Sequence, residues 1–270
     1  PPREMRPMFD EQVRPILAAV QDAVIASHTQ RVFGVGESAL EDLVRPLLEG
    51  ANPTAALYAK TGEVHIRTTA RAATMAKAEA MCEEHAGRLR KVLGSLIYSE
   101  NGDDLETVCV HLLARKKKQL ATAESCTGGM LSGRITSVPG ASEVFGFGLC
   151  SYANKTKQQV LGVRAETLAS HGAVSPQTAA EMAFGAMRVA EADIGVGITG
   201  IAGPGGGTQQ KPVGLVYVAV AQGAKALVKQ LHLGGRGREV VRLMATQHAL
   251  DMVRRLLLEL PIEDAVEYGG

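Results

Sequence analysis

The stretch TAESCTGG, residues 122–129, lies where a predicted strand over 119–124 runs into a predicted helix over 127–137. At such a junction the unpaired N–H groups of the helix start can bind an anion or stabilise an oxyanion. Ser125 is placed there as a candidate nucleophile, and the glycine pair 128–129 leaves room for a substrate.

Two other roles for this stretch stay open. Ser125 or Thr127 can simply cap the helix, and Cys126 is a rival nucleophile, although a small buried hydrophobe is its more common role. The stretch is not the GxSxG elbow of α/β-hydrolases, because Ala123 stands in place of the first glycine.

Strands and helices alternate on both sides of this stretch, which indicates a layered α/β domain over residues 103–270. The pattern predicts helices over 105–118, 127–137, 165–170, 176–191 and 238–260, and strands over 119–124, 144–152, 192–199, 213–221 and 226–233.

The first half predicts a smaller α+β domain over residues 28–102, after a connector helix within residues 1–27. The loop-like Asn101-Gly102-Asp103-Asp104 marks the boundary with the second domain. The expected elements are a helix over 6–27, an apolar run over 30–35, a helix over 37–48, a hairpin over 54–58 and 63–68, a helix over 70–93 and a strand over 96–98.

A serine nucleophile needs a base, and SYANKTK, residues 151–157, follows the glycine-rich strand 144–152. An amine at the end of a buried strand is partly desolvated and can accept a proton, so Tyr152 or Lys157 could serve. The alternative is that Lys155 and Lys157 are solvated loop lysines.

A second glycine-rich segment lies at residues 195–214, where eight of twenty residues are glycine. Clustered main-chain N–H groups can form an anion-binding nest here, or the segment can be a flexible connection. It matches neither a P-loop nor a dinucleotide-binding fingerprint. Arg238 begins the last helix, where it can pair with a phosphate or remain solvated.

Composition excludes several classes of function. The net charge of +1 and 4% aromatic residues disfavour nucleic-acid binding. Four cysteines form no disulfide framework, the seven histidines form no metal motif, and no segment resembles a signal peptide or membrane span. We therefore expect a soluble cytoplasmic protein without a metal or other cofactor, and a fragment of a longer chain.

Four motifs together resemble the nicotinamide-nucleotide amidohydrolase domain of the CinA (competence/damage-inducible) family. They are TAESCTGG, SYANKTK, HGAVSPQT (171–178) and GITGIAGPGGGTQQKPVG (197–214). VFGVGESALEDLV (32–44) resembles the family's KH-like middle domain, and PPREMRPM (1–8) resembles the end of its molybdopterin-binding-like domain, most of which is absent here.

The resemblance implies hydrolysis of nicotinamide mononucleotide to nicotinate mononucleotide and ammonia, a step in pyridine nucleotide recycling. It implies Ser125 as nucleophile, Lys157 as base and Tyr152 in the same hydrogen-bonded set. It assigns substrate binding to Thr127, Gly128, Ser142, Thr199, Gly200, Gly203 and Arg238, with Ser142 in a turn that closes over the site.

The sequence departs from the family pattern in two places, so two properties of the family are not expected of this chain. The pyrophosphatase site of the missing first domain is not expected, and the KH-like unit contains no GxxG between Gln30 and Gly102, so RNA binding is not expected. We expect a homodimer that binds nicotinamide mononucleotide and no membrane. The alternative is a competence- or DNA-damage-associated regulatory or nucleotide-binding protein without turnover, which a salt-dependent gel shift would reveal.

Overall fold

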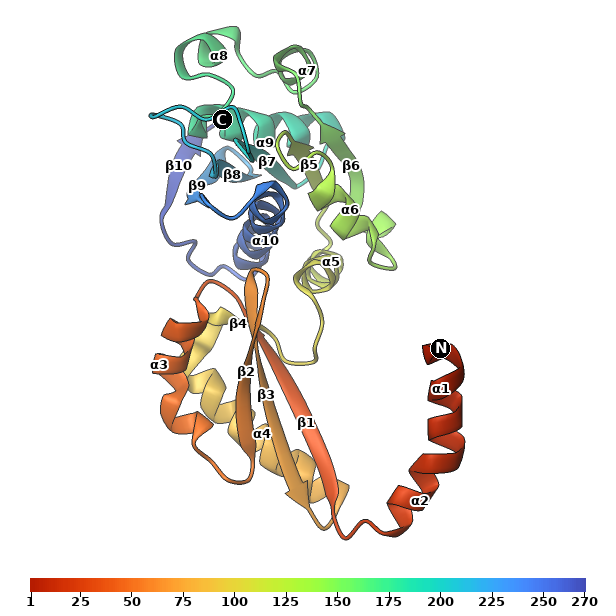
Figure 1. Cartoon of the computed structure of the whole chain (residues 1–270). Helices are drawn as coiled ribbons and strands as arrows, with labels where there is room; N and C mark the ends of the chain where they lie inside the picture. Colours follow the sequence, from red (N-terminus) through yellow and green to blue (C-terminus); the bar gives the residue numbers. More distant parts are fainter. The chain divides into compact units, whose positions relative to one another are not determined.

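The computed structural model describes residues 1–270, and its internal contacts divide the chain into two compact units, Pro1–Gly102 and Asp103–Gly270. Each unit has its own sheet, with four strands in the first and six in the second (Figure 1). The observed mixed α/β architecture agrees with the fold class predicted from the sequence.

The second unit is built on one mixed sheet in the order β10-β9-β8-β7-β5-β6. Strand β5 is parallel to β6 and β7, whereas β8, β9 and β10 join by antiparallel pairing. The strands are β5 (Leu120–Glu124), β6 (Phe145–Cys150), β7 (Ile194–Gly200), β8 (Leu215–Gln222), β9 (Lys225–His232) and β10 (Ala265–Gly269).

Helices cover both faces of this sheet, as Figure 1 shows. One face carries α8 (Ala165–His171) and α9 (Pro176–Ala190), with α7 (Asn154–Gln159) after β6, and the other carries α5 (Leu105–Lys116), α6 (Met130–Thr136) and α10 (Arg238–Leu257). Small side chains fill the α9 side, among them Ala121, Ala123, Ala183 and Ala219, all fully buried.

Helix α9 lies unusually close to β7 because two strand residues have no side chain. A Cβ atom on Gly195 would lie 2.0 Å from the Ala183 carbonyl oxygen, and one on Gly197 would lie 2.2 Å from that of Ala179. Real Cβ contacts never approach so closely, so glycine at these positions fixes the separation between helix and sheet.

The first unit has a four-stranded antiparallel sheet in the order β2-β3-β1-β4. The strands are β1 (Val24–Val32), β2 (Thr54–Lys60), β3 (Glu63–Ala72) and β4 (Ile97–Ser99), and the helices are α3 (Glu37–Leu48) and α4 (Met75–Leu93). Both helices pack on one face of the sheet, where Val32, Leu40, Ile66 and Leu89 are buried.

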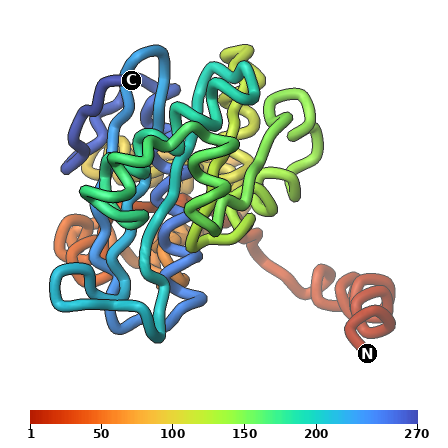
Figure 2. Tube along the Cα trace, turned by 90° about the horizontal axis from the view of Figure 1, so that it is seen from above, coloured from red at the N-terminus to blue at the C-terminus, as the bar shows by residue number.

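Before the sheet, residues 2–19 form one helical stretch without a buried residue. It consists of α1 (Pro2–Met8), a π-helical turn over Phe9–Val13 and α2 (Arg14–Ala19), and Figure 2 traces the short connection from it to β1. Pro15 lacks the N–H group that the preceding turn would need for regular α-helical bonding, which explains the wider turn.

Several predicted boundaries were wrong. The helix expected over 6–27 ends at Ala19, and the helix expected from residue 70 begins at Met75, because Val24 pairs with Ala72 and both flanks extend the β1–β3 ladder. Tertiary pairing overrides the local helical pattern in both places. The short helix α7 and strand β10 were not predicted at all.

Replacing Gly197 by Ala should lower the free energy of unfolding of the second unit by about 2 kcal/mol or more, because the added methyl group collides with the α9 main chain. Urea denaturation measures this change. Gly146→Ala in β6 is the matched control, since a Cβ there meets nothing within 4 Å, and equal stability of the two variants would contradict the argument.

Candidate active site

The side chains of Ser125 and Lys157 meet at the carboxyl end of the parallel strands. Ser125 follows the last residue of β5, and its N–H group donates to the Ile198 carbonyl of β7 at 2.9 Å. Lys157 lies on α7, which follows β6, and its Nζ donates to Ser125 Oγ at 3.0 Å. The carboxyl edge of parallel strands is where ligands bind in open α/β sheets.

Two main-chain carbonyls fix the amine of Lys157. Its Nζ donates to Ser151 O at 2.6 Å and to Tyr152 O at 3.3 Å, in addition to Ser125 Oγ. The side chain is only 1% exposed, and this burial lowers its pKa from the ordinary value of 10.5. The neutral amine, which can accept a proton, is therefore more populated than in a solvated lysine.

The turn that carries Ser125 is held by the carboxylate of Glu124, which is completely buried. One oxygen accepts from the N–H groups of Gly129 at 3.1 Å and Leu131 at 3.0 Å, and the other accepts from Ser132 N at 2.8 Å and Oγ at 2.7 Å. A carboxylate at this point also compensates the positive end of the α6 dipole. Glu124 thus accepts hydrogen bonds from most of the N–H groups at the start of α6, where the sequence analysis predicted that a substrate anion could bind.

The remaining donors lie closer to Ser125. In the main-chain hydrogen bonds of this turn, Gly128 N donates to Ser125 O and Met130 N donates to Thr127 O, while the N–H groups of Cys126 and Thr127 donate to no main-chain carbonyl. These two N–H groups follow the Ser125 hydroxyl directly, as oxyanion donors in acyl-transfer enzymes often do.

Cys126 differs from Ser125 in its surroundings. Its side chain is 5% exposed, and burial raises the pKa of the thiol to about 11. A thiol that stays protonated at neutral pH is a poor nucleophile, so the structure favours the buried-hydrophobe interpretation of this cysteine.

Thr127 and Gly128 border an arginine that the sequence analysis did not single out. Arg242 Nη2 donates to the Thr127 carbonyl at 2.6 Å, and a Cβ on Gly128 would lie 3.5 Å from the same nitrogen. Thr127 Oγ1 and Arg242 Nε are both buried without a hydrogen-bond partner. Both atoms belong to residues that lie against the turn of Ser125.

Arg242 could have been found from sequence. It lies four residues after Arg238, so both arginines occupy one face of α10 at helical spacing. Arg238 Nη1 donates to the Gly203 carbonyl at 2.9 Å, which ties the glycine-rich loop to the start of α10.

Thr199 and Gly200 end strand β7, next to the Ser125 turn. Thr199 is buried and donates its hydroxyl to the Ala173 carbonyl at 2.6 Å. Gly200 is required by packing, since a Cβ there would lie 2.7 Å from the Leu215 carbonyl oxygen.

Two predicted site residues are placed differently from expectation. Tyr152 reaches Lys157 through its main-chain carbonyl, whereas its phenol side chain is 64% exposed. Ser142 is exposed in the 3₁₀ turn Ala141–Glu143 before β6, and Phe145 pairs with Leu120 at the start of β5. That turn lies where the parallel strands β5 and β6 begin, whereas Ser125 lies where β5 ends. Ser142 therefore does not close over the site of its own chain.

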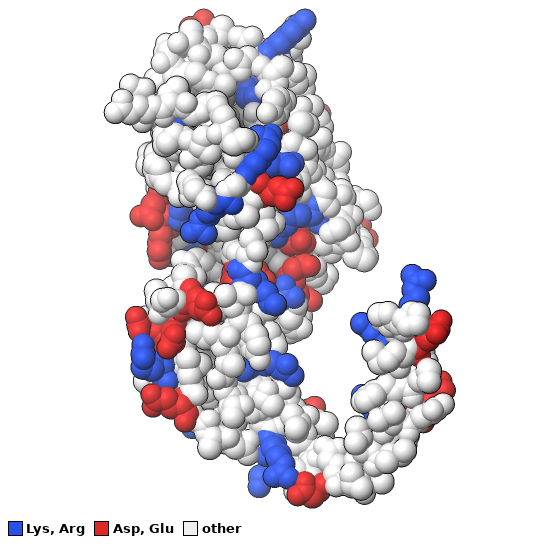
Figure 3. Space-filling model, in the orientation of Figure 1, with Lys and Arg blue, Asp and Glu red and all other residues white.

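Charged side chains of both signs are interspersed on the visible face in Figure 3, as the net charge of +1 implies. No helix is both long and apolar enough to cross a membrane. His, Cys, Asp and Glu side chains form no group of three or more that could hold a metal ion.

Comparison with known proteins identifies the family. Residues 102–257 match the model of the CinA C-terminal domain, and residues 27–99 match that of the damage-inducible protein CinA KH domain. The chain belongs to the CinA family. A CinA-like protein of Desulfovibrio desulfuricans is 49% identical over 265 residues, which cover 97% of this chain and 62% of the relative. The CinA-like protein of Kosmotoga olearia is 47% identical, with coverage of 96% and 63%.

Solved CinA structures resemble part of the chain. The competence/damage inducible protein CihA of Agrobacterium tumefaciens has a TM-score of 0.55 and 42% identity, covering 56% of this chain and 93% of that protein. A CinA superfamily protein of Escherichia coli has a TM-score of 0.54 and 30% identity, with coverage of 61% and 97%. This CinA chain spans less than two thirds of the length of the curated relatives named above.

Glu124→Gln in this CinA chain should lower the free energy of unfolding by about 2 kcal/mol, because an amide NH₂ would face main-chain N–H donors that now bind a carboxylate. Thermal or urea denaturation measures the loss. Glu143→Gln, at an exposed position, should leave stability unchanged. A Glu124→Gln variant as stable as the unmodified protein would contradict the stabilising role of the Glu124 carboxylate.

Proposed function

We propose that this CinA chain hydrolyses nicotinamide mononucleotide to nicotinate mononucleotide and ammonia, with Ser125 as nucleophile and Lys157 as base. The observation that supports this most directly is the 3.0 Å contact between Lys157 Nζ and Ser125 Oγ in a buried setting. Hydrolysis of an aromatic carboxamide needs a nucleophile, a proton carrier and oxyanion donors, all of which residues at this site could provide.

The two carbonyls around Lys157 suggest how the base is oriented. A neutral amine has two N–H bonds and one lone pair. If Ser151 O and Tyr152 O accept the two N–H bonds, the lone pair is left for the Ser125 hydroxyl. Lys157 then takes the hydroxyl proton as Ser125 Oγ forms a bond to the carboxamide carbon.

The N–H groups of Cys126 and Thr127 are the proposed oxyanion donors. Collapse of the tetrahedral intermediate breaks the C–N bond, and Lys157 returns its proton to the leaving nitrogen, which departs as ammonia. Water, deprotonated in turn by Lys157, then cleaves the acyl-enzyme and releases the carboxylate product.

The substrate phosphate would lie near Arg242 and Arg238. The contact of Arg242 Nη2 with the Thr127 carbonyl at 2.6 Å supports this placement, because it brings the arginine to the turn of Ser125, and a planar guanidinium suits bidentate phosphate binding. Gly128, Thr199, Gly200 and Gly203 would shape the walls of the same site. Because Glu124 occupies the start of α6, these arginines rather than the α6 dipole would hold the phosphate.

Ser142 and the phenol of Tyr152 enter this proposal in a more limited way. The exposed phenol would cover the substrate, and Ser142 would take part only from a second copy of the chain, in keeping with a homodimer. We place the activity in the cytoplasm, where pyridine nucleotides are recycled.

Replacing Ser125 by Ala should reduce ammonia release from nicotinamide mononucleotide by about a thousandfold or more, while circular dichroism and stability stay unchanged. Cys126→Ser is the matched control and should retain activity. Full activity in Ser125→Ala would overturn the proposed function. If Cys126→Ser were inactive and Ser125→Ala were active, Cys126 would be the nucleophile. Free nicotinamide and the riboside, assayed in parallel, test the need for the phosphate.

The pH dependence of kcat/KM should report the titration of Lys157. Burial lowers the pKa of this amine below 10.5, so its neutral form gains population as pH rises and is lost as pH falls through the lowered pKa. We expect kcat/KM to rise with pH to a plateau that begins below 10.5. A rate that falls over this range, or Lys157→Met with unchanged activity, would exclude Lys157 as the base.

A further inference from the structure

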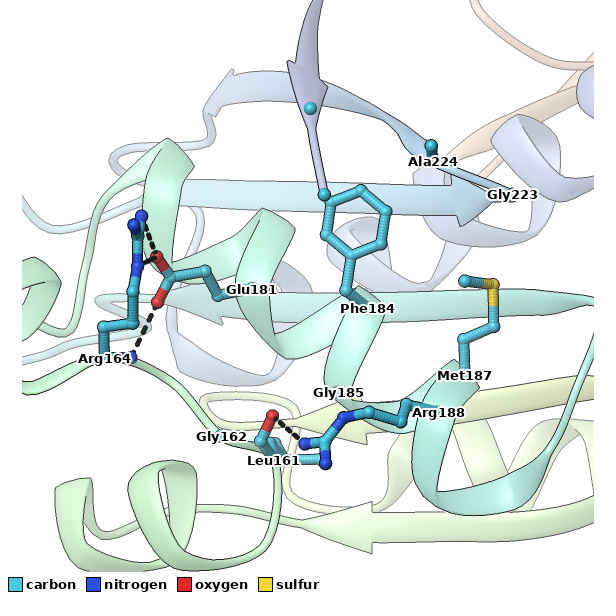
Figure 4. Close-up of a pocket in the computed structure, with 12 residues that line it drawn as sticks. Leu161, Gly162, Arg164, Glu181, Phe184, Gly185, Met187, Arg188, Gly223 and Ala224 are labelled. Carbon is cyan, nitrogen blue, oxygen red and sulfur yellow. Dashed lines mark hydrogen bonds and ion pairs between the residues drawn. The ribbon is translucent and has the colours of Figure 1, made fainter.

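A cavity of about 720 Å³ lies in the same unit as Ser125 but is built from other residues. Its walls come from the C-terminal half of α9, the segment after α7, the β8–β9 turn at Gly223 and the end of β10 (Figure 4). This volume is within the range of about 300–1,000 Å³ that small-molecule sites occupy.

The cavity is separate from the Ser125 site. Gln222, which precedes the turn that lines the cavity, pairs with Ile194 at the start of β7, whereas the N–H group of Ser125 bonds Ile198 near its end. The β8–β9 side of the cavity therefore lies toward the start of β7, and none of the residues that line the cavity belongs to the proposed catalytic set.

Of the two arginines that line the cavity, one forms an ion pair and the other does not. Glu181 accepts from Arg164 Nε at 2.7 Å, Arg164 N at 2.9 Å and Thr167 Oγ1 at 2.7 Å, so its charge offsets that of Arg164. Arg188 is exposed, forms no ion pair, and its side chain donates to the Leu161 carbonyl at 3.0 Å. The guanidinium is therefore available to pair with one negatively charged group of a ligand.

Gly162 determines where the Arg188 guanidinium can lie. A Cβ atom on Gly162 would be 2.7 Å from Arg188 Nη2, so any larger residue would displace the guanidinium from the Leu161 carbonyl. The backbone of Gly162 has φ +71°, a conformation that glycine adopts without strain. Glycine at position 162 thus leaves room for Arg188 to bond to the Leu161 carbonyl at the cavity wall.

The remaining lining residues are apolar side chains and glycines. The Phe184 ring projects from α9 toward the end of β10, with the Arg164–Glu181 pair on one side and Met187 on the other (Figure 4). The glycines 162, 185, 223, 269 and 270 present main chain without side chains around it. Such a surface suits a planar ring, which can pack against Phe184.

We propose that this cavity binds a small aromatic carboxylate, with its ring against Phe184 and its single negative charge at Arg188. The site is independent of the amidohydrolase reaction, and the ligand is defined by a monoanionic group on a planar apolar body. A dianion fits less well, because Glu181 is part of the same wall.

Benzoate and benzamide test the proposal, since they share shape and differ in charge. In NMR titrations of the full chain, benzoate should shift the amide signals of Gly162, Gly185 and Gly223 and bind at least about tenfold more tightly than benzamide. Arg188→Gln should weaken benzoate binding by about tenfold or more and leave benzamide binding unchanged. Arg115→Gln, an exposed arginine on α5, is the matched control and should change neither.

Three outcomes would overturn the proposal. They are equal affinity for benzoate and benzamide, unchanged benzoate binding in Arg188→Gln, and benzoate-induced shifts confined to residues around Ser125. These measurements do not involve ammonia release. They therefore test the proposed carboxylate site independently of the proposed amidohydrolase reaction.

Discussion

The buried carboxylate of Glu124 is the interaction on which the second unit depends most. It ends strand β5 and at the same time accepts hydrogen bonds from three N–H groups and one hydroxyl at the start of α6. Strand, turn and helix are therefore joined through one side chain, and the intervening Ser125 has little freedom. A charge without these donors would be too costly to bury, so the carboxylate and the turn require each other.

The carboxylate also affects how an anion can be bound. A helix N-terminus is commonly available to phosphate, but here its donors are already satisfied from within the protein. In the proposed function, the arginines of α10 and the N–H groups of Cys126 and Thr127 take over this task. The proposed site would then bind the phosphate with side-chain cations and the oxyanion with main-chain donors.

Sequence reasoning predicted the order of most elements of the second unit and singled out Ser125 and Lys157. Local patterns sufficed there because the five residues of β5 form a short buried strand and the glycine pair 128–129 follows within a few residues.

Helix α7 was missed because its six residues are polar, and only the fold shows that Lys157 among them is buried. The position of Ser142 depends on the parallel pairing of β5 with β6, which no local pattern encodes. The ladder between β1 and β3 likewise extends into segments whose local spacing is helical.

Strand β6 forms an open edge of the six-stranded sheet, and its sequence FGFGLC contains no charge and no proline. Natural sheets usually protect such edges with lysine, proline or a bulge, because unpaired main-chain groups can accept a strand from another molecule. In this chain, the register of the ladder shifts at Gly146, because Leu120 pairs with Phe145 and Ala121 pairs with Phe147. A strand from another molecule would have to follow this shifted register in order to pair with β6, so the irregularity at Gly146 protects an edge that has no charge and no proline.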